Sequence, residues 1–385
     1  MSDNRLENDP GLDTAACRAR HLLGGRTTIG GGHSEALELV AGRRSGPPDH
    51  GDVMSIKARL MAASRVGGGH GLADEEANGL ASHLVDTARR TMEAFEGGAS
   101  SGMVGAEDAL ALEAVIQTRG RPAVRVVGDG LDPDGFIPPE DDRWRQIADS
   151  HRRMLLDIAG TVAAVRVRDA YNPSFTWVQG TAWMLADGLA VTNRHVLFPP
   201  PGGTALARRV YGSSSARVRR DYFVELDFAF DNGPARQHVC KVIDVPWVAA
   251  EVDPVDAAIL RVELLQGPTT GRLELAQGDG GDLGSLFVVG HPGRMPEIPE
   301  RVRLVFGDPD ERKRVSFGEA MNDPGARPGE IVHDASTIGG YSGGGVFSFL
   351  NRSVEALHYW GSVTAGNRAI TAAALRAHPE FNRFL

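Results

Sequence analysis

The stretch that decides the fold runs from residue 180 to residue 196 and reads Gly-Thr-Ala-Trp-Met-Leu-Ala-Asp-Gly-Leu-Ala-Val-Thr-Asn-Arg-His-Val. Two apolar runs flank the dipeptide Asp187-Gly188, which is a strong signal for a hairpin turn. The second run ends at Thr192, and His195 follows shortly after it. The pattern therefore predicts two antiparallel strands with a histidine just beyond the end of the second strand.

The chain from residue 160 onward repeats this pattern of short strands. Helical periodicity largely disappears, and apolar, β-branched runs recur with turn signals between them. The runs cover residues 161–167, 180–185, 189–192, 223–230, 239–245, 257–262, 286–290, 302–306, 346–349 and 356–360. Such spacing is typical of an all-β barrel or sandwich, so we expect a mainly β fold in this half.

Two further segments of this half carry polar residues that can work with His195. Asp256 opens the apolar run Ala-Ala-Ile-Leu, and Ser342 lies in the turn Gly-Gly-Tyr-Ser-Gly-Gly-Gly. A serine hydroxyl needs an adjacent base, which a neutral imidazole supplies when a carboxylate fixes its tautomer. We therefore predict Ser342 as nucleophile, His195 as general base and Asp256 as the group that orients His195. Asp253 is the alternative to Asp256.

The glycines around Ser342 have their own chemical reason. A tetrahedral intermediate needs backbone N–H donors aimed at its oxyanion, and glycine lets the chain turn tightly enough to aim them. The predicted donors are the amides of Gly340 and Ser342.

The order histidine, aspartate, serine, together with Thr-Asn-Arg-His-Val and Gly-x-Ser-Gly-Gly, resembles the trypsin-like (chymotrypsin-fold) serine proteases. The resemblance covers residues 160–385 and is greatest to the bacterial branch that includes the glutamyl endopeptidases. It implies a chymotrypsin-like double β-barrel of two six-stranded antiparallel barrels, with the site in the cleft between them, followed by a C-terminal helix over about residues 371–385. It further implies a serine endopeptidase that acts on a protein or peptide substrate and needs neither a metal nor another cofactor.

The resemblance also suggests a substrate preference. Thr337 and His358 match the threonine and histidine with which glutamyl endopeptidases bind an acidic P1 side chain, although both could simply shape a small polar pocket. Ser336 stands where trypsins carry the acid that selects Lys or Arg, which disfavours trypsin-type specificity. Tyr341 replaces the usual Asp or Asn before the serine, so activation through a freed N-terminus is not expected.

The first 150 residues read differently. Leu80, Leu84, Ala88 and Met92 lie four apart within residues 74–95, as on one face of an amphipathic helix. Residues 123–127 predict a strand, and residues 142–158 predict a helix. We expect a mostly helical domain over residues 1–150 and a protease domain over residues 151–385. The first domain carries no catalytic motif, and we expect it to control access to the site or to recruit a protein activator or regulator.

Composition limits the other classes of function. The chain has 385 residues, a net charge of −9 and 42% hydrophobic residues, which excludes wholesale disorder and argues against a general nucleic-acid binder. Its two cysteines, Cys17 and Cys240, cannot form a disulfide framework. No secretory signal and no membrane-length apolar run is present, so a cytoplasmic protein without a membrane partner is expected.

Three alternatives stay open. A protein that keeps the protease fold without turnover would serve as a binding or scaffold protein, and an esterase would use the same three residues. A Gly-x-Ser-Gly turn also resembles the nucleophile elbow of α/β-hydrolases, in which the histidine follows the serine, as His358 does here. The absence of a helical pattern directly after Ser342 argues against the elbow.

Overall fold

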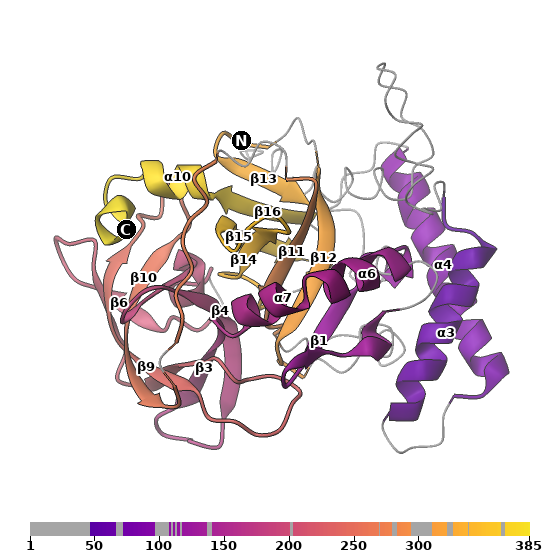
Figure 1. Cartoon of the computed structure of the whole chain (residues 1–385), viewed down its shortest axis with the longest axis horizontal. Coiled ribbons are helices and arrows are strands. Elements are labelled where there is room, and N and C mark those ends of the chain that lie inside the picture. The colour runs from indigo at the N-terminus through magenta and orange to yellow at the C-terminus, as the bar shows by residue number, and fades with distance from the viewer. Residues whose placement is uncertain are drawn as a thin grey trace, which may run out of the picture.

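In the computed structural model, the described part of the chain forms two closed barrels, a region that precedes them and a short helical segment that follows them (Figure 1). The described residues are 47–66, 72–96, 108, 111, 114–115, 118–136, 141–200, 203–268, 270–278, 283–293, 310–321, 326–337, 339–362 and 366–385.

The described part of the N-terminal region begins with two long helices that lie side by side, α3 (His50–Val66) and α4 (Asp74–Glu96). The predicted helix over residues 74–95 is confirmed by α4. Leu84, Ala88 and Met92 are buried, as the apolar face requires. Three acidic residues in the first turn of α4 complement the positive end of the helix dipole.

The first barrel consists of six antiparallel strands that close on themselves. The strand order is β10-β5-β4-β3-β8-β9, and β9 pairs with β10 to complete the circle. The short strands β6 (Ala207–Arg209) and β7 (Ala216–Val218) join this sheet through β9. The barrel strands are β3 (Val162–Asp169), β4 (Thr176–Ala186), β5 (Leu189–Thr192), β8 (Tyr222–Asp227), β9 (Val239–Val248) and β10 (Ala258–Gln266).

The second barrel has the same closed, six-stranded form. Its order is β11-β14-β15-β16-β13-β12, and β12 pairs with β11. The strands are β11 (Ser285–Gly290), β12 (Arg314–Met321), β13 (Glu330–His333), β14 (Gly345–Ser348), β15 (Val354–Ser362) and β16 (Gly366–Thr371). Two closed antiparallel barrels after a region with helices confirm the predicted mainly β, chymotrypsin-like fold class.

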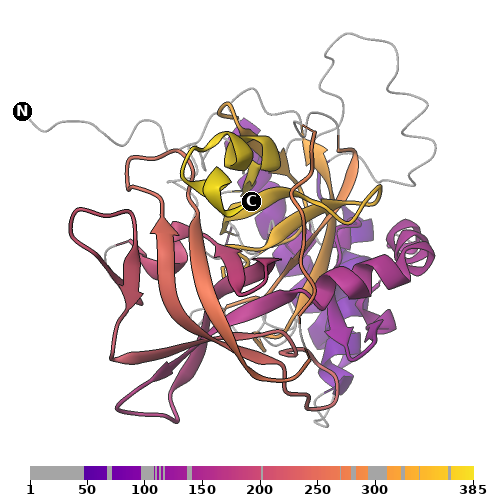
Figure 2. The same cartoon turned by 60° about the vertical axis from the view of Figure 1, so that its left-hand side comes forward.

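The segment between the helix pair and the barrels lies directly against the second barrel (Figures 1 and 2). Strand β1 (Ala123–Val127) confirms the predicted strand; it pairs with the hairpin partner β2 (Gly130–Leu131) and with β12. After the short turn η2 (Pro133–Gly135), Phe136 and Trp144 each place their ring 5.7 Å from the ring of Phe317 in β12. The apolar core of the second barrel therefore extends across the predicted domain boundary at residue 150.

Three predictions of local structure need correction. The predicted helix over residues 142–158 is two helices, α6 (Asp142–Ser150) and α7 (Arg152–Ala159), because the backbone at His151 leaves the helical region. The expected C-terminal helix over residues 371–385 stops after α10 (Ala372–Ala377), since Pro379 forces His378 into an extended conformation, and only the short turn η3 (Phe381–Phe384) follows. Strands β2, β6, β7, β12, β13 and β16 were not predicted, and the predicted run 302–306 lies outside the described residues.

Two findings bear on chemistry outside the site. Cys240 is a free, buried cysteine, and Cys17 lies outside the described residues. Among the helices that the structure describes, none has the length and apolar character needed to cross a bilayer.

Candidate active site

His195 lies on the short helix α8 (Arg194–Leu197), immediately after β5. The hairpin that leads to it turns at Gly188, whose φ of +72° favours glycine. Asn193, fully buried, donates from Nδ2 to the backbone oxygen of Asp256 at 2.7 Å. The end of β5 is thereby joined to the start of β10, and His195 is brought beside Asp256.

His195 and Asp256 are joined at two points. His195 Nδ1 lies 2.6 Å from Asp256 Oδ2, and the backbone N–H of His195 donates to Asp256 Oδ1 at 3.1 Å. Burial acts to raise the pKa of Asp256, but the hydrogen bonds from His195 and the charges of His195 and Arg194 outweigh it and hold that pKa below its usual value. The carboxylate is therefore kept ionised where it faces the imidazole.

Asp253 lies elsewhere. Its Oδ2 is 2.8 Å from His378 Nε2, and its Oδ1 accepts from the N–H of Val255. Of the two aspartates considered from the sequence, Asp256 is thus the one in contact with His195.

Ser342 lies in a tight turn that is held by the first barrel. Its carbonyl accepts from the N–H of Thr181 at 2.8 Å, and the Thr181 hydroxyl donates to the carbonyl of Gly340 at 2.8 Å. Gly343 has φ +91°, and a Cβ there would come within 2.0 Å of the Thr181 carbonyl oxygen. Only glycine allows this approach, so the turn is fixed at the junction of the two barrels.

The same junction brings Ser342 toward His195. A Cβ on Gly180 would touch both the Val196 side chain, at 2.7 Å, and the Ser342 carbonyl oxygen, at 3.1 Å. Within the described part of the chain, Ser342 Oγ and His195 Nε2 do not form a hydrogen bond with each other. Hydrogen bonds of this kind are often long in a free enzyme and tighten when substrate binds.

The two predicted oxyanion donors are available. Gly340 has φ +99°, and its turn passes so close to Gly293 that a Cβ would reach the Gly293 nitrogen at 2.3 Å. Neither the N–H of Gly340 nor that of Ser342 donates a hydrogen bond to any described residue. The arrangement leaves both amides free to bind a developing negative charge.

Thr337 and His358 both lie in the second barrel and are buried. The Thr337 hydroxyl donates to Asn367 Oδ1, and His358 Nδ1 lies 3.1 Å from His333 Nε2. Burial, with the nearby His333 and His195, lowers the pKa of His358 well below its usual value, so the ring is neutral. His358 Nε2 is buried without a hydrogen-bond partner among the described residues.

The sequence did not predict the residues that position the site residues through tertiary contacts. Thr181 is one of many residues in an apolar strand, and His333 stands in a short strand that was not predicted. Tyr341 was seen only as a departure from the family pattern. Its buried ring lies against Gly290, where a Cβ would come within 2.5 Å of it, and its hydroxyl is 2.9 Å from Ser316 Oγ.

The fold and this junction define a class: two closed antiparallel barrels that bring a histidine–aspartate pair and a glycine-rich serine turn together. Residues 180–354 match the family model of the trypsin-like peptidase domain. The matched range includes His195, Asp256 and Ser342. Over this range the chain is similar to trypsin-like peptidases. No curated protein matches the chain.

Proposed function

We propose that this chain is a serine endopeptidase in which Ser342 attacks the scissile carbonyl and His195 takes up the serine proton. Asp256 orients His195, and the amides of Gly340 and Ser342 bind the oxyanion. His195 then returns the proton to the leaving amine, and water repeats the sequence on the acyl-enzyme. The observation that carries this proposal is the two-point contact between His195 and Asp256.

The direct test is covalent labelling of the full-length chain with a fluorophosphonate, with the adduct mapped by mass spectrometry. We expect labelling at Ser342 that disappears in Ser342→Ala and in His195→Ala. Asp253→Asn is the matched control, because Asp253 contacts His378 rather than His195. Labelling that survives His195→Ala would contradict the proposed base. No labelling of the wild type would favour a binding protein with a protease fold.

We further propose that the protease prefers an acidic P1 residue through Thr337 and His358. The support is chemical: His358 Nε2 has no partner among the described residues, and its N–H could donate to a carboxylate while Nδ1 accepts from His333. Because His358 is fully buried, the side chains that cover it must move aside when a substrate enters.

The preference is tested with peptides that differ only at P1. We expect kcat/KM for P1 Glu to exceed that for the isosteric Gln by about tenfold, the value of a hydrogen bond to a charged group. His333→Leu should reduce this ratio, since a leucine side chain cannot donate a hydrogen bond to His358 Nδ1. Equal rates for Glu and Gln would show that Thr337 and His358 only shape the second barrel.

A further inference from the structure

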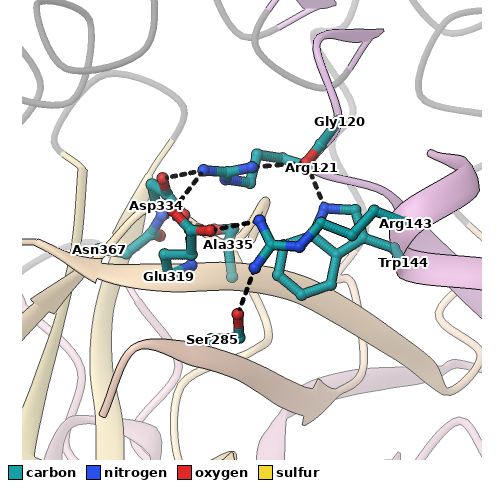
Figure 3. Close-up of polar contacts among 9 residues, drawn as sticks. All are labelled: Gly120, Arg121, Arg143, Trp144, Ser285, Glu319, Asp334, Ala335 and Asn367. Atoms are coloured by element: carbon teal, nitrogen blue, oxygen red, sulfur yellow. Dashed lines mark hydrogen bonds and ion pairs between the residues drawn. The ribbon is translucent and has the colours of Figure 1, made fainter. Parts of the chain in front are cut away.

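A buried ion pair joins the region before the barrels to the segment that leads to Ser342 (Figure 3). Arg121 Nη2 donates to Asp334 Oδ2 at 2.7 Å and also lies 3.3 Å from Glu319 Oε2. The side chains of Arg121 and Asp334 are 2% and 0% exposed. The partners are separated by 213 positions in sequence, so only the tertiary fold brings them together.

Asp334 is the first residue after β13 and starts the segment 334–344, which ends in the Ser342 turn. Its Oδ1 accepts from the N–H of Glu319 at 2.6 Å, and its own N–H donates to the Glu319 carbonyl. The next residue, Ala335, is held by Asn367 Nδ2 at 2.7 Å. The segment is therefore anchored at its origin, and Arg121 supplies the charge that balances the buried carboxylate there.

Arg121 is itself fixed on both sides. Arg119, two residues earlier, makes a buried bidentate pair with Asp52 of α3, with contacts of 2.8 and 2.6 Å. The carbonyl of Gly120 accepts from Trp144 Nε1 at 2.6 Å, and β1 starts two residues after Arg121. The backbone that carries the Arg121 guanidinium is thus held in place on both sides of Arg121.

We propose that Arg121 is a positioning residue: through Asp334 it orders the segment 334–344 that carries the oxyanion donors and the nucleophile. This inference rests on the proposed function and adds that the region before residue 150 is part of the working protease. A buried charge left without its partner is strongly unfavourable, whereas removing both charges is tolerated. Loss of Arg121 alone therefore either displaces Asp334 and the chain behind it or draws water in.

The test compares Arg121→Met, Asp334→Asn and the double variant with one matched control. Arg143→Met is the control. Arg143, like Arg121, contacts Glu319 and lies over the Trp144 ring, yet it has no contact with Asp334 (Figure 3). The double variant removes both charges and keeps an oxygen for the Glu319 N–H, so we expect it to stay folded even if Arg121→Met does not.

Three readouts are taken: kcat and KM for a peptide ester, the rate of fluorophosphonate labelling, and deuterium uptake of residues 334–344. We expect the double variant and each folded single variant to lose about 100-fold in kcat and in labelling rate, as a small misplacement of reacting groups can cause. The losses should not add, and deuterium uptake of this segment should rise. Arg143→Met should stay within about threefold of wild type.

The opposite outcomes overturn the proposal. A folded double variant that is labelled at the wild-type rate would show that the pair only stabilises the fold, as would an equal loss in Arg143→Met. Unchanged deuterium uptake would show that Arg121 does not order the segment. Failure of the proposed function is distinguished by the wild type: if it is not labelled at Ser342, both proposals fall, whereas a labelled wild type with an equally labelled double variant sinks only this one.

Discussion

Replacement of Asp256 by asparagine tests the proposed mechanism, because it changes which imidazole nitrogen of His195 carries the proton. Asp256 accepts two hydrogen bonds from His195, one from the backbone N–H at 3.1 Å and one at the imidazole Nδ1 at 2.6 Å. The backbone N–H is a fixed donor, so it selects the amide oxygen of the introduced asparagine. The amide nitrogen must then face Nδ1.

An amide nitrogen can only donate, so Nδ1 must become the acceptor and the imidazole proton moves to Nε2. Nε2 then presents N–H to the Ser342 hydroxyl and cannot take its proton. The same exchange in a Ser-His-Asp triad lowers kcat by about 10⁴-fold. At about 1.4 kcal/mol for each factor of ten, the barrier rises by about 5 kcal/mol.

The assay is steady-state hydrolysis of a peptide ester at neutral pH, with thermal unfolding measured on the same samples. Asp253→Asn is the matched control and should keep wild-type kcat, since Asp253 contacts His378 and the N–H of Val255. The reasoning would be refuted if folded Asp256→Asn stayed within about tenfold of wild type, or if Asp253→Asn lost as much.

Three further predictions concern stability. Gly343→Ala should lower the free energy of unfolding by at least about 3 kcal/mol, because its Cβ meets the Thr181 oxygen at 2.0 Å and φ is +91°. The control Gly212→Ala has φ +70° but open space around it, so it should lower the free energy of unfolding by only about 1 kcal/mol. Equal losses of the two variants in urea unfolding would count against the steric argument. Burial lowers the pKa of Lys313 to about 8, so between about pH 8 and pH 10 the unfolded chain binds more protons at Lys313. The free energy of unfolding of the wild type should therefore rise with pH relative to Lys313→Met, by up to about 3 kcal/mol, and a constant difference would disprove this. The pKa of Asp256 is lowered on folding, so its contribution to stability is present above the ordinary carboxyl pKa and is lost as the pH falls through the lowered value. The free energies of unfolding of wild type and Asp256→Asn should therefore converge as the pH falls through this range in acid denaturation. A constant difference between the two proteins would contradict this prediction.

The strands that the sequence predicts are those whose buried residues are apolar. β5 and β10 pair in the first barrel, and both are rich in buried aliphatic residues, so composition and position agree. β12 departs from this pattern because the polar residues Arg314 and Ser316 are buried in it. Arg314 pairs with Asp310, four residues earlier, whereas Ser316 contacts Tyr341, 25 positions away in sequence. Burial of polar residues can be predicted only when their partners are known.

Some helix boundaries could also be predicted from the sequence, and others could not. The end of α10 could have been predicted, since Pro379 restricts the residue before it. The break between α6 and α7 could not, because His151 is neither glycine nor proline and its N–H still donates to the Ile147 carbonyl at 3.0 Å. The apolar periodicity continues across the break, so it carries no trace of it.

The candidate site shows which features can be predicted from short segments of sequence and which cannot. His195, Asp256 and Ser342 each stand in a short segment whose residue types suit their proposed chemistry, and those segments could be recognised one at a time. The contacts that place them, such as the Thr181 hydroxyl on the Gly340 carbonyl, join residues far apart in sequence. No single segment encodes such a pair.

The turn at Ser342 is held from three directions, and this bears on the role of the N-terminal region. The first barrel holds it through Thr181, the second through Asn367 on the preceding segment, and the region before the barrels through Arg121 on Asp334. Under the proposed function, loss of any one of these contacts would loosen the segment that carries Ser342. We propose on this basis that a partner that binds α3 and α4 changes activity through the pair of Asp52 with Arg119, which lies two residues before Arg121.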